Sequence, residues 1–150
     1  MSLFDKISAD IKDAMLARDK VRLEALRGIK KEFIEAKTAK GSNGELEDDT
    51  ALKILQKMVK QRKDSASIYS QNGREDMAET ELIEASVIES YLPKQLTREE
   101  IIPLINEELH SLGINDIKMM GRVIGSLQKK LSGMVDGKIL ADTVKEILSK

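Results

Sequence analysis

Basic side chains gather near the end of the chain, and side chains of this type bind anions. From Ile117 onward the sequence has seven basic and three acidic residues, a net charge of +4, while the whole chain of 150 residues has a net charge of −1. Residues 1–92, with 16 basic and 18 acidic side chains, have a net charge of −2. The main anion-binding surface is therefore expected in the last part of the chain. Its candidate residues are Lys118, Arg122, Lys129, Lys130 and Lys138.

Gly121 and Gly125 form a G-x-x-x-G pattern among these basic residues. On a helix the two glycines lie one turn apart, and the absence of side chains lets another backbone approach closely. We favour tight packing against another helix as the explanation. The alternative is that a polymer backbone docks on the glycines, beside a basic edge to which Lys118 and Arg122 contribute at i, i+4 spacing.

Arg62 lies on the apolar stripe of a predicted helix, where an unpaired charge would be costly. Glu84 holds the comparable position on the next predicted helix and is the expected partner. We favour a structural ion pair between the two that fixes the register of the helices. The alternative is a basic groove for phosphate, to which Arg27 and Lys30 could add.

Residue patterns typical of enzymes are absent from the sequence. His110 is the only histidine and there is no cysteine, so no transition-metal site is expected. The sequence has no P-loop, no dinucleotide-binding fingerprint and no Gly-Ser-rich loop that would present a nucleophilic serine. Asp136 stands before a helical pattern and is interpreted as a helix N-cap. The sequence therefore predicts no catalytic residue, no metal ligand and no cofactor.

The composition favours helices as the elements that position these residues. Charged residues make up 34% of the chain and aromatic residues 3%, and the apolar residues are mainly Leu, Ile, Ala and Met, so an all-α fold is expected. Apolar spacing and turn residues predict helices over residues 2 to about 18, 20 to about 40, 48 to about 72, 74 to about 92, 97 to about 113, 117 to about 131 and 138 to about 148.

The segment Tyr91–Thr97 divides these helices into two groups. Pro93 disfavours helical geometry at the preceding residue, and Thr97 with Glu100 forms a capping box that begins a new helix. We expect an N-terminal domain of long antiparallel helices over residues 1–93 and a small three-helix domain over residues 94–150. No signal peptide and no apolar stretch of membrane-spanning length is visible, so a soluble cytoplasmic protein without membrane contact is expected.

Five short segments occur in an order that resembles the GatB/YqeY family. They are Lys60–Ser65, Glu84, Tyr91–Leu96, Met120–Val123 and Val135–Gly137. The chain looks like a free-standing YqeY-like protein. The resemblance implies an all-helical N-terminal domain followed by a small helical domain similar to the tail of the B subunit of the tRNA-dependent amidotransferase. That tail helps to hold tRNA while transamidation takes place elsewhere.

The resemblance implies contact with RNA more directly than catalysis. We expect an accessory module that binds tRNA or another structured RNA through the five basic residues named above. One alternative is carbon–nitrogen ligase activity with glutamine as the amide donor, carried out as or with an amidotransferase subunit. A further alternative is a helical adaptor for another protein partner.

Overall fold

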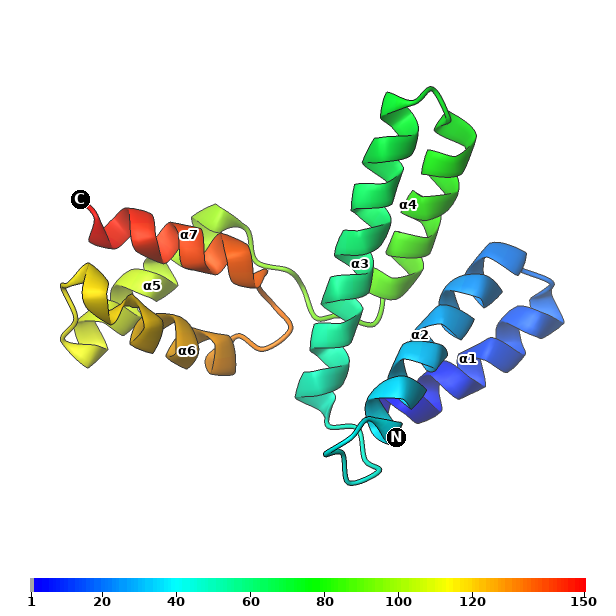
Figure 1. The fold of residues 1–150 in the computed structure, drawn as a ribbon, viewed down its shortest axis with the longest axis horizontal. Helices are drawn as coiled ribbons and strands as arrows, with labels where there is room; N and C mark the ends of the chain where they lie inside the picture. The colour runs from blue at the N-terminus through cyan, green and yellow to red at the C-terminus, as the bar shows by residue number, and fades with distance from the viewer. Residues whose placement is uncertain (1) are drawn as a thin grey trace. The chain divides into compact units, whose positions relative to one another are not determined.

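The computed structural model describes residues 2–150, and over that range it contains α-helices and one 3-10 helix but no strand (Figure 1). The all-α prediction is confirmed. The elements are α1 Leu3–Ala17, α2 Lys20–Thr38, α3 Asp48–Gln71, α4 Glu75–Glu89, α5 Arg98–Leu112, η1 Ile117–Met119, α6 Met120–Lys130 and α7 Gly137–Leu148. The chain forms two compact units, unit 1 (Met1–Leu92) and unit 2 (Pro93–Lys150).

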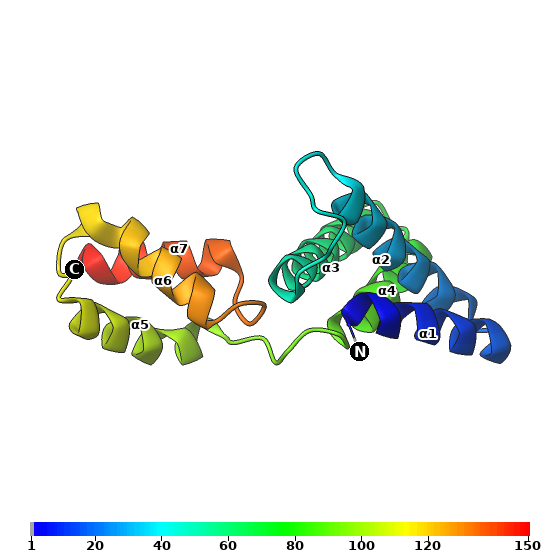
Figure 2. The same cartoon turned by 90° about the horizontal axis from the view of Figure 1, so that it is seen from below.

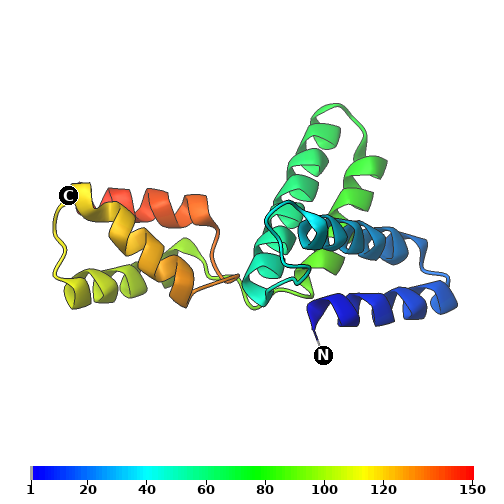
Figure 3. The same cartoon turned by 60° about the horizontal axis from the view of Figure 1, so that its bottom comes forward.

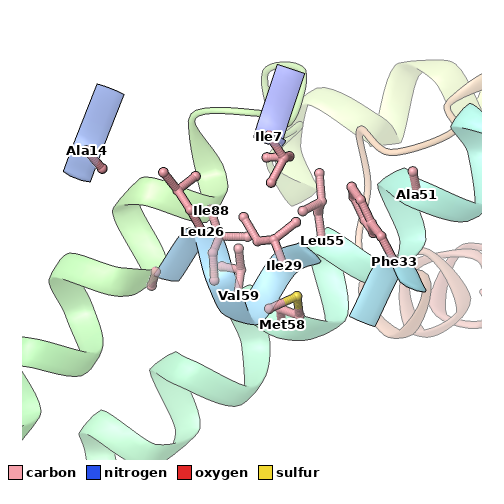
Figure 4. Close-up of a cluster of buried hydrophobic side chains, with 11 residues drawn as sticks. Ile7, Ala14, Leu26, Ile29, Phe33, Ala51, Leu55, Met58, Val59 and Ile88 are labelled. Carbon is pink, nitrogen blue, oxygen red and sulfur yellow. The ribbon is translucent and has the colours of Figure 1, made fainter. Parts of the chain in front are cut away.

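Unit 1 is built from two helical hairpins, α1 with α2 and α3 with α4 (Figure 2). Helix α2 also packs against both α3 and α4. Asp19 begins α2 by accepting a hydrogen bond from the backbone N–H of Arg22, which satisfies one of the free donors at the helix start. Apolar side chains of α1 to α4 meet in one core (Figure 4). Its largest fully buried members are Phe33, Ile7, Leu26, Ile29, Leu55 and Ile88.

Unit 2 packs α5, α6 and α7 around a second core (Figure 3). The capping box predicted at the start of α5 is present: Thr97 accepts from the Glu100 N–H, and the Glu100 carboxylate accepts from the Thr97 N–H. Gly113 ends α5 with a φ of 65°, a left-handed conformation that glycine adopts without a side-chain penalty. The fully buried residues of this core are Ile101, Ile105, Val123, Leu140 and Val144.

Two boundaries differ from the sequence-based expectation. The helix expected from residue 117 begins as the 3-10 turn η1 and becomes α-helical only at Met120. Asp116 accepts a hydrogen bond from the Lys118 N–H, which favours a tight turn there. Helix α4 ends at Glu89 rather than Leu92, three residues earlier, and a turn follows in which the Leu92 N–H donates to the Glu89 carbonyl.

Hydrogen bonds fix both ends of the Tyr91–Thr97 segment. The Tyr91 hydroxyl donates to Asp10 of α1 at 2.5 Å, which ties the first residue to unit 1. The Gln95 amide donates to the Gly133 carbonyl at 2.6 Å, and the Leu96 N–H donates to the Met134 carbonyl at 2.7 Å, so the later residues belong to unit 2. The motif residues Tyr91 and Gln95 thus each anchor the segment to one unit.

Replacement of Tyr91 by Phe should destabilise unit 1 by about 1–2 kcal/mol, because the partly buried Asp10 loses its donor. Burial, and secondly the hydrogen bond to Asp10, raise the pKa of Tyr91 above its ordinary value of 10.0. A raised pKa stabilises the fold below pH 10 and loses that stabilisation as the pH rises further. Denaturant unfolding should therefore show a difference between wild type and Tyr91→Phe that is constant near neutrality and shrinks above pH 10.

Tyr69→Phe is the matched control, since no hydrogen bond of the Tyr69 hydroxyl occurs within residues 2–150. Equal losses of stability in the two variants would contradict the role given to Tyr91.

Candidate nucleic-acid interface

The core of unit 2 fixes which side of α6 faces outward. Val123 and Leu127 are buried, so the apolar side of α6 packs inward. At 100° per residue, Gly121, Gly125 and Lys129 lie along the opposite side. Arg122 lies next to Lys129 on that side. The outer side of α6 therefore combines small residues with basic residues.

The two glycines of α6 have open space around them. Apart from the adjoining backbone of α6 itself, a Cβ atom added at Gly121 or at Gly125 would meet no atom within 4 Å. Within unit 2, therefore, no helix packs against the two glycines in the way that we favoured from the sequence. This face of α6 leaves the backbone open to the approach of another molecule.

A shallow groove of about 450 Å³ runs along this side of α6. Its lining residues are Arg122, Gly125, Ser126, Lys129 and Lys130. We call this the α6 groove. Among the ion pairs found within residues 2–150, none includes Arg122 or Lys129, and both side chains are exposed. These two cations are therefore available to an external anion.

The other predicted basic residues stand in different surroundings. Lys118 in η1 and Lys138 in the first turn of α7 are exposed but do not line the α6 groove. Lys130 lines the groove, yet its Nζ donates to the Glu108 carboxylate at 2.7 Å. The structure thus brings Arg122, Lys129 and Lys130 together and leaves Lys118 and Lys138 outside the groove.

Glu108 of α5, whose side chain is 7% exposed, was not among the residues predicted from the sequence. One carboxylate oxygen accepts from the Ser126 hydroxyl at 2.6 Å, and the other accepts from Lys130. Lys130 first, and Ser126 second, hold the pKa of Glu108 below its ordinary value. The sequence does contain a signal for a buried Glu108, because this charged residue falls at i+3 from Ile105 on the apolar stripe of α5.

Arg62 and Glu84 lie together in unit 1. Arg62 Nε is 3.0 Å from Glu84 Oε2 and 3.9 Å from Glu81 Oε2, and the side chains of Arg62 and Glu84 are 25% and 15% exposed. The Nε–H is not aligned with the carboxylate for a hydrogen bond, so the contact is an ion pair only. Burial raises the pKa of Glu84, while the nearby Arg62 acts in the opposite direction.

Arg27 and Lys30 line a different groove, on α2 alone, together with Lys31, Ile34 and Glu35. Arg62 is not among its lining residues, and Arg27 pairs with Glu24 at 3.4 Å. Instead, Arg62 extends toward α2 at Gly28, where an added Cβ would lie 3.3 Å from Arg62 Nη2. Arg27, Lys30 and Arg62 therefore do not form the basic phosphate groove that is the alternative explanation for Arg62.

The sequence pattern of the Yqey-like protein family matches residues 4–148, nearly the whole chain and both units. The chain belongs to the YqeY-like family. The family segments quoted from the sequence contain Arg62, Glu84, Tyr91 and Gln95, which form the contacts described above, and Arg122, which lines the α6 groove.

Fungal relatives of this YqeY-like chain carry the name Altered inheritance of mitochondria protein 41, mitochondrial. The protein of Kluyveromyces lactis is 30% identical over 143 residues, covering 93% of this chain and 72% of the relative. That of Pyrenophora tritici-repentis is 29% identical over 148 residues, covering 95% and 79%. The match to the Vanderwaltozyma polyspora protein is 38% identical over 90 residues, covering 57% of this chain and less than half of the relative, 46%.

Within residues 2–150 of the YqeY-like chain, no helix has the length and apolar character needed to cross a bilayer. In the same range, no three or more His, Cys, Asp or Glu side chains are grouped so that they could hold a metal ion.

Replacing Gly121 or Gly125 by Ala should stabilise unit 2 by about 0.5–1 kcal/mol each, because Ala is the better helix former and no neighbour is displaced. Thermal and denaturant unfolding check this. Gly28→Ala is the matched control, and it should stabilise less or destabilise because its Cβ would crowd Arg62. Destabilisation by Gly121→Ala or Gly125→Ala would show that this face is packed after all.

Replacing Arg62 by Ala should destabilise unit 1 by about 1–3 kcal/mol, because Glu84 and Glu81 would face each other without a cation. The pKa of Glu84, already raised, should rise further. A raised carboxyl pKa costs stability as the pH rises through it, so the deficit of Arg62→Ala should be larger at pH 7 than at pH 4.

Lys63→Ala is the control for this variant, since it removes the more exposed pair of Lys63 with Glu89 and should cost about 1 kcal/mol or less. A deficit for Arg62→Ala that is equal to that of Lys63→Ala and independent of pH would contradict the structural role of Arg62.

Proposed function

We propose that unit 2 binds structured RNA through the α6 groove and that tRNA, the class implied by the family resemblance, is its ligand. The observation that carries this proposal is the outer side of α6. There, two exposed cations that form no ion pair within residues 2–150, Arg122 and Lys129, lie beside two glycines with open space around them.

The chemistry of this side suits a sugar–phosphate backbone. Arg and Lys neutralise phosphates, and bare glycine backbone lets a rigid polymer come close to the helix. Aromatic residues make up 3% of the chain, so stacking of unpaired bases contributes little. Recognition then depends on the shape and phosphate positions of a folded RNA, as is usual for double-stranded RNA. Lys118 and Lys138, outside the groove, add long-range attraction rather than direct contacts.

In this proposal the protein holds RNA and carries out no reaction of its own. The relation to the tRNA-dependent amidotransferase rests on the family resemblance, and it suggests an accessory role beside a catalytic partner. The proposed setting is the cytoplasm. The word mitochondrial in the relatives' name describes those proteins, and tRNA is present in both compartments.

Replacing Arg122 by Ala should weaken tRNA binding and reduce the magnitude of the slope of log K against log salt by up to about 0.9, because one phosphate contact is lost. Lys129→Ala should act in the same way. Binding of tRNA and of an unstructured RNA of equal length is measured at several salt concentrations, with circular dichroism to show that the helices remain.

Lys145→Ala on α7 removes an exposed lysine that does not line the α6 groove and should leave affinity almost unchanged. Equal micromolar-or-weaker affinity for both RNAs would overturn the proposed function, and so would a salt slope that Arg122→Ala leaves unchanged.

A further inference from the structure

The direction of one hydrogen bond determines what Ser126 offers to a ligand in the α6 groove. A serine hydroxyl has one hydrogen to donate and two lone pairs that accept. The Ser126 hydroxyl lies 2.6 Å from Glu108 Oε1, a distance typical of a hydroxyl bound to a carboxylate. An ionised carboxylate only accepts, so the hydrogen of Ser126 points toward Glu108.

Glu108 is held in this arrangement from both sides. Its side chain is 7% exposed, and its second oxygen accepts from Lys130 at 2.7 Å. Lys130 first, and Ser126 second, lower the pKa of Glu108, so the carboxyl stays ionised at neutral pH. The hydroxyl hydrogen of Ser126 is therefore used in the hydrogen bond to Glu108, and only the lone pairs of the Ser126 oxygen are left for a ligand in the groove.

The hydrogen bond from Ser126 to Glu108 determines which group of a nucleic acid can bind to Ser126. A phosphodiester oxygen at neutral pH has no hydrogen, and Ser126 has none left to give it. A ribose 2′-hydroxyl can donate, and it is the group by which a protein distinguishes RNA from DNA. Arg122 and Lys129, which line the same groove, supply donors for the neighbouring phosphates. The groove thus presents donors for phosphate and an acceptor for the sugar.

We propose that Ser126, positioned by Glu108, accepts a hydrogen bond from a ribose 2′-hydroxyl and makes the α6 groove selective for RNA over a nucleic acid of the same shape without that hydroxyl. This inference rests on the proposed function, since it names the part of the RNA that the groove recognises. Ser126 is a specificity-determining residue, and Glu108 is a positioning residue that acts through it.

The test compares a chemically synthesised tRNA with a counterpart that carries fluorine in place of every 2′-hydroxyl. The fluorinated sugar keeps the A-form shape but cannot donate a hydrogen bond. Wild-type protein should bind the hydroxyl form more tightly. Ser126→Ala should weaken binding of the hydroxyl form by roughly three- to tenfold and leave binding of the fluorinated form unchanged. Ser126→Thr keeps the hydroxyl and should keep the preference.

Arg122→Ala separates failure of this inference from failure of the proposed function. It should weaken binding of both tRNA forms by the same factor, because both carry the phosphates. If Arg122→Ala changes neither affinity, the proposed function itself is wrong. If Arg122→Ala weakens both while Ser126→Ala changes both equally or changes neither, the groove binds phosphate but Ser126 does not read the 2′-hydroxyl.

Discussion

The arrangement of polar side chains on the outer side of α6 depends on the hydrogen bonds that the buried Glu108 carboxylate accepts from α6. Val123 and Leu127 set the rotation of α6 by packing into the core of unit 2, and Glu108 then holds Ser126 and Lys130 from the neighbouring helix α5. Lys130 is thereby partly neutralised. Arg122 and Lys129, without an ion pair in residues 2–150, carry the charge that remains for a ligand.

In each unit, the ion pair with the least exposed carboxylate lies between two helices, and the consequences differ. In unit 1, Arg62 lies among Glu84, Glu81 and the backbone at Gly28, and burial raises the pKa of Glu84. In unit 2, hydrogen bonds lower the pKa of Glu108. In unit 1, the charge of Arg62 is neutralised by the ion pair that holds α3 to α4. In unit 2, Lys130 is paired with Glu108, while the other cations that line the α6 groove, Arg122 and Lys129, are not.

Local sequence signals predicted the helices and their ends well, because capping is determined by neighbouring residues. The capping box at Thr97 and the glycine end of α5 depend on no distant contact. The neighbours of Gly121 and Gly125 could not be predicted in this way, since the same pattern fits packed and open faces. The placement of Arg62 beside Glu84 followed from two charges on apolar stripes. The same reasoning applied to Glu108 predicts that its carboxylate needs polar partners, but it does not identify Ser126 and Lys130.

The most direct measurement of the central claim is a titration of the ¹⁵N-labelled full-length protein with tRNA, followed by amide chemical shifts. If the α6 groove binds tRNA, the earliest and largest changes occur at α6, including the amides of Gly121 and Gly125, and the amides around Arg27 and Lys30 of α2 change little. Changes centred on Arg27 and Lys30, with α6 unaffected, would contradict binding at the α6 groove.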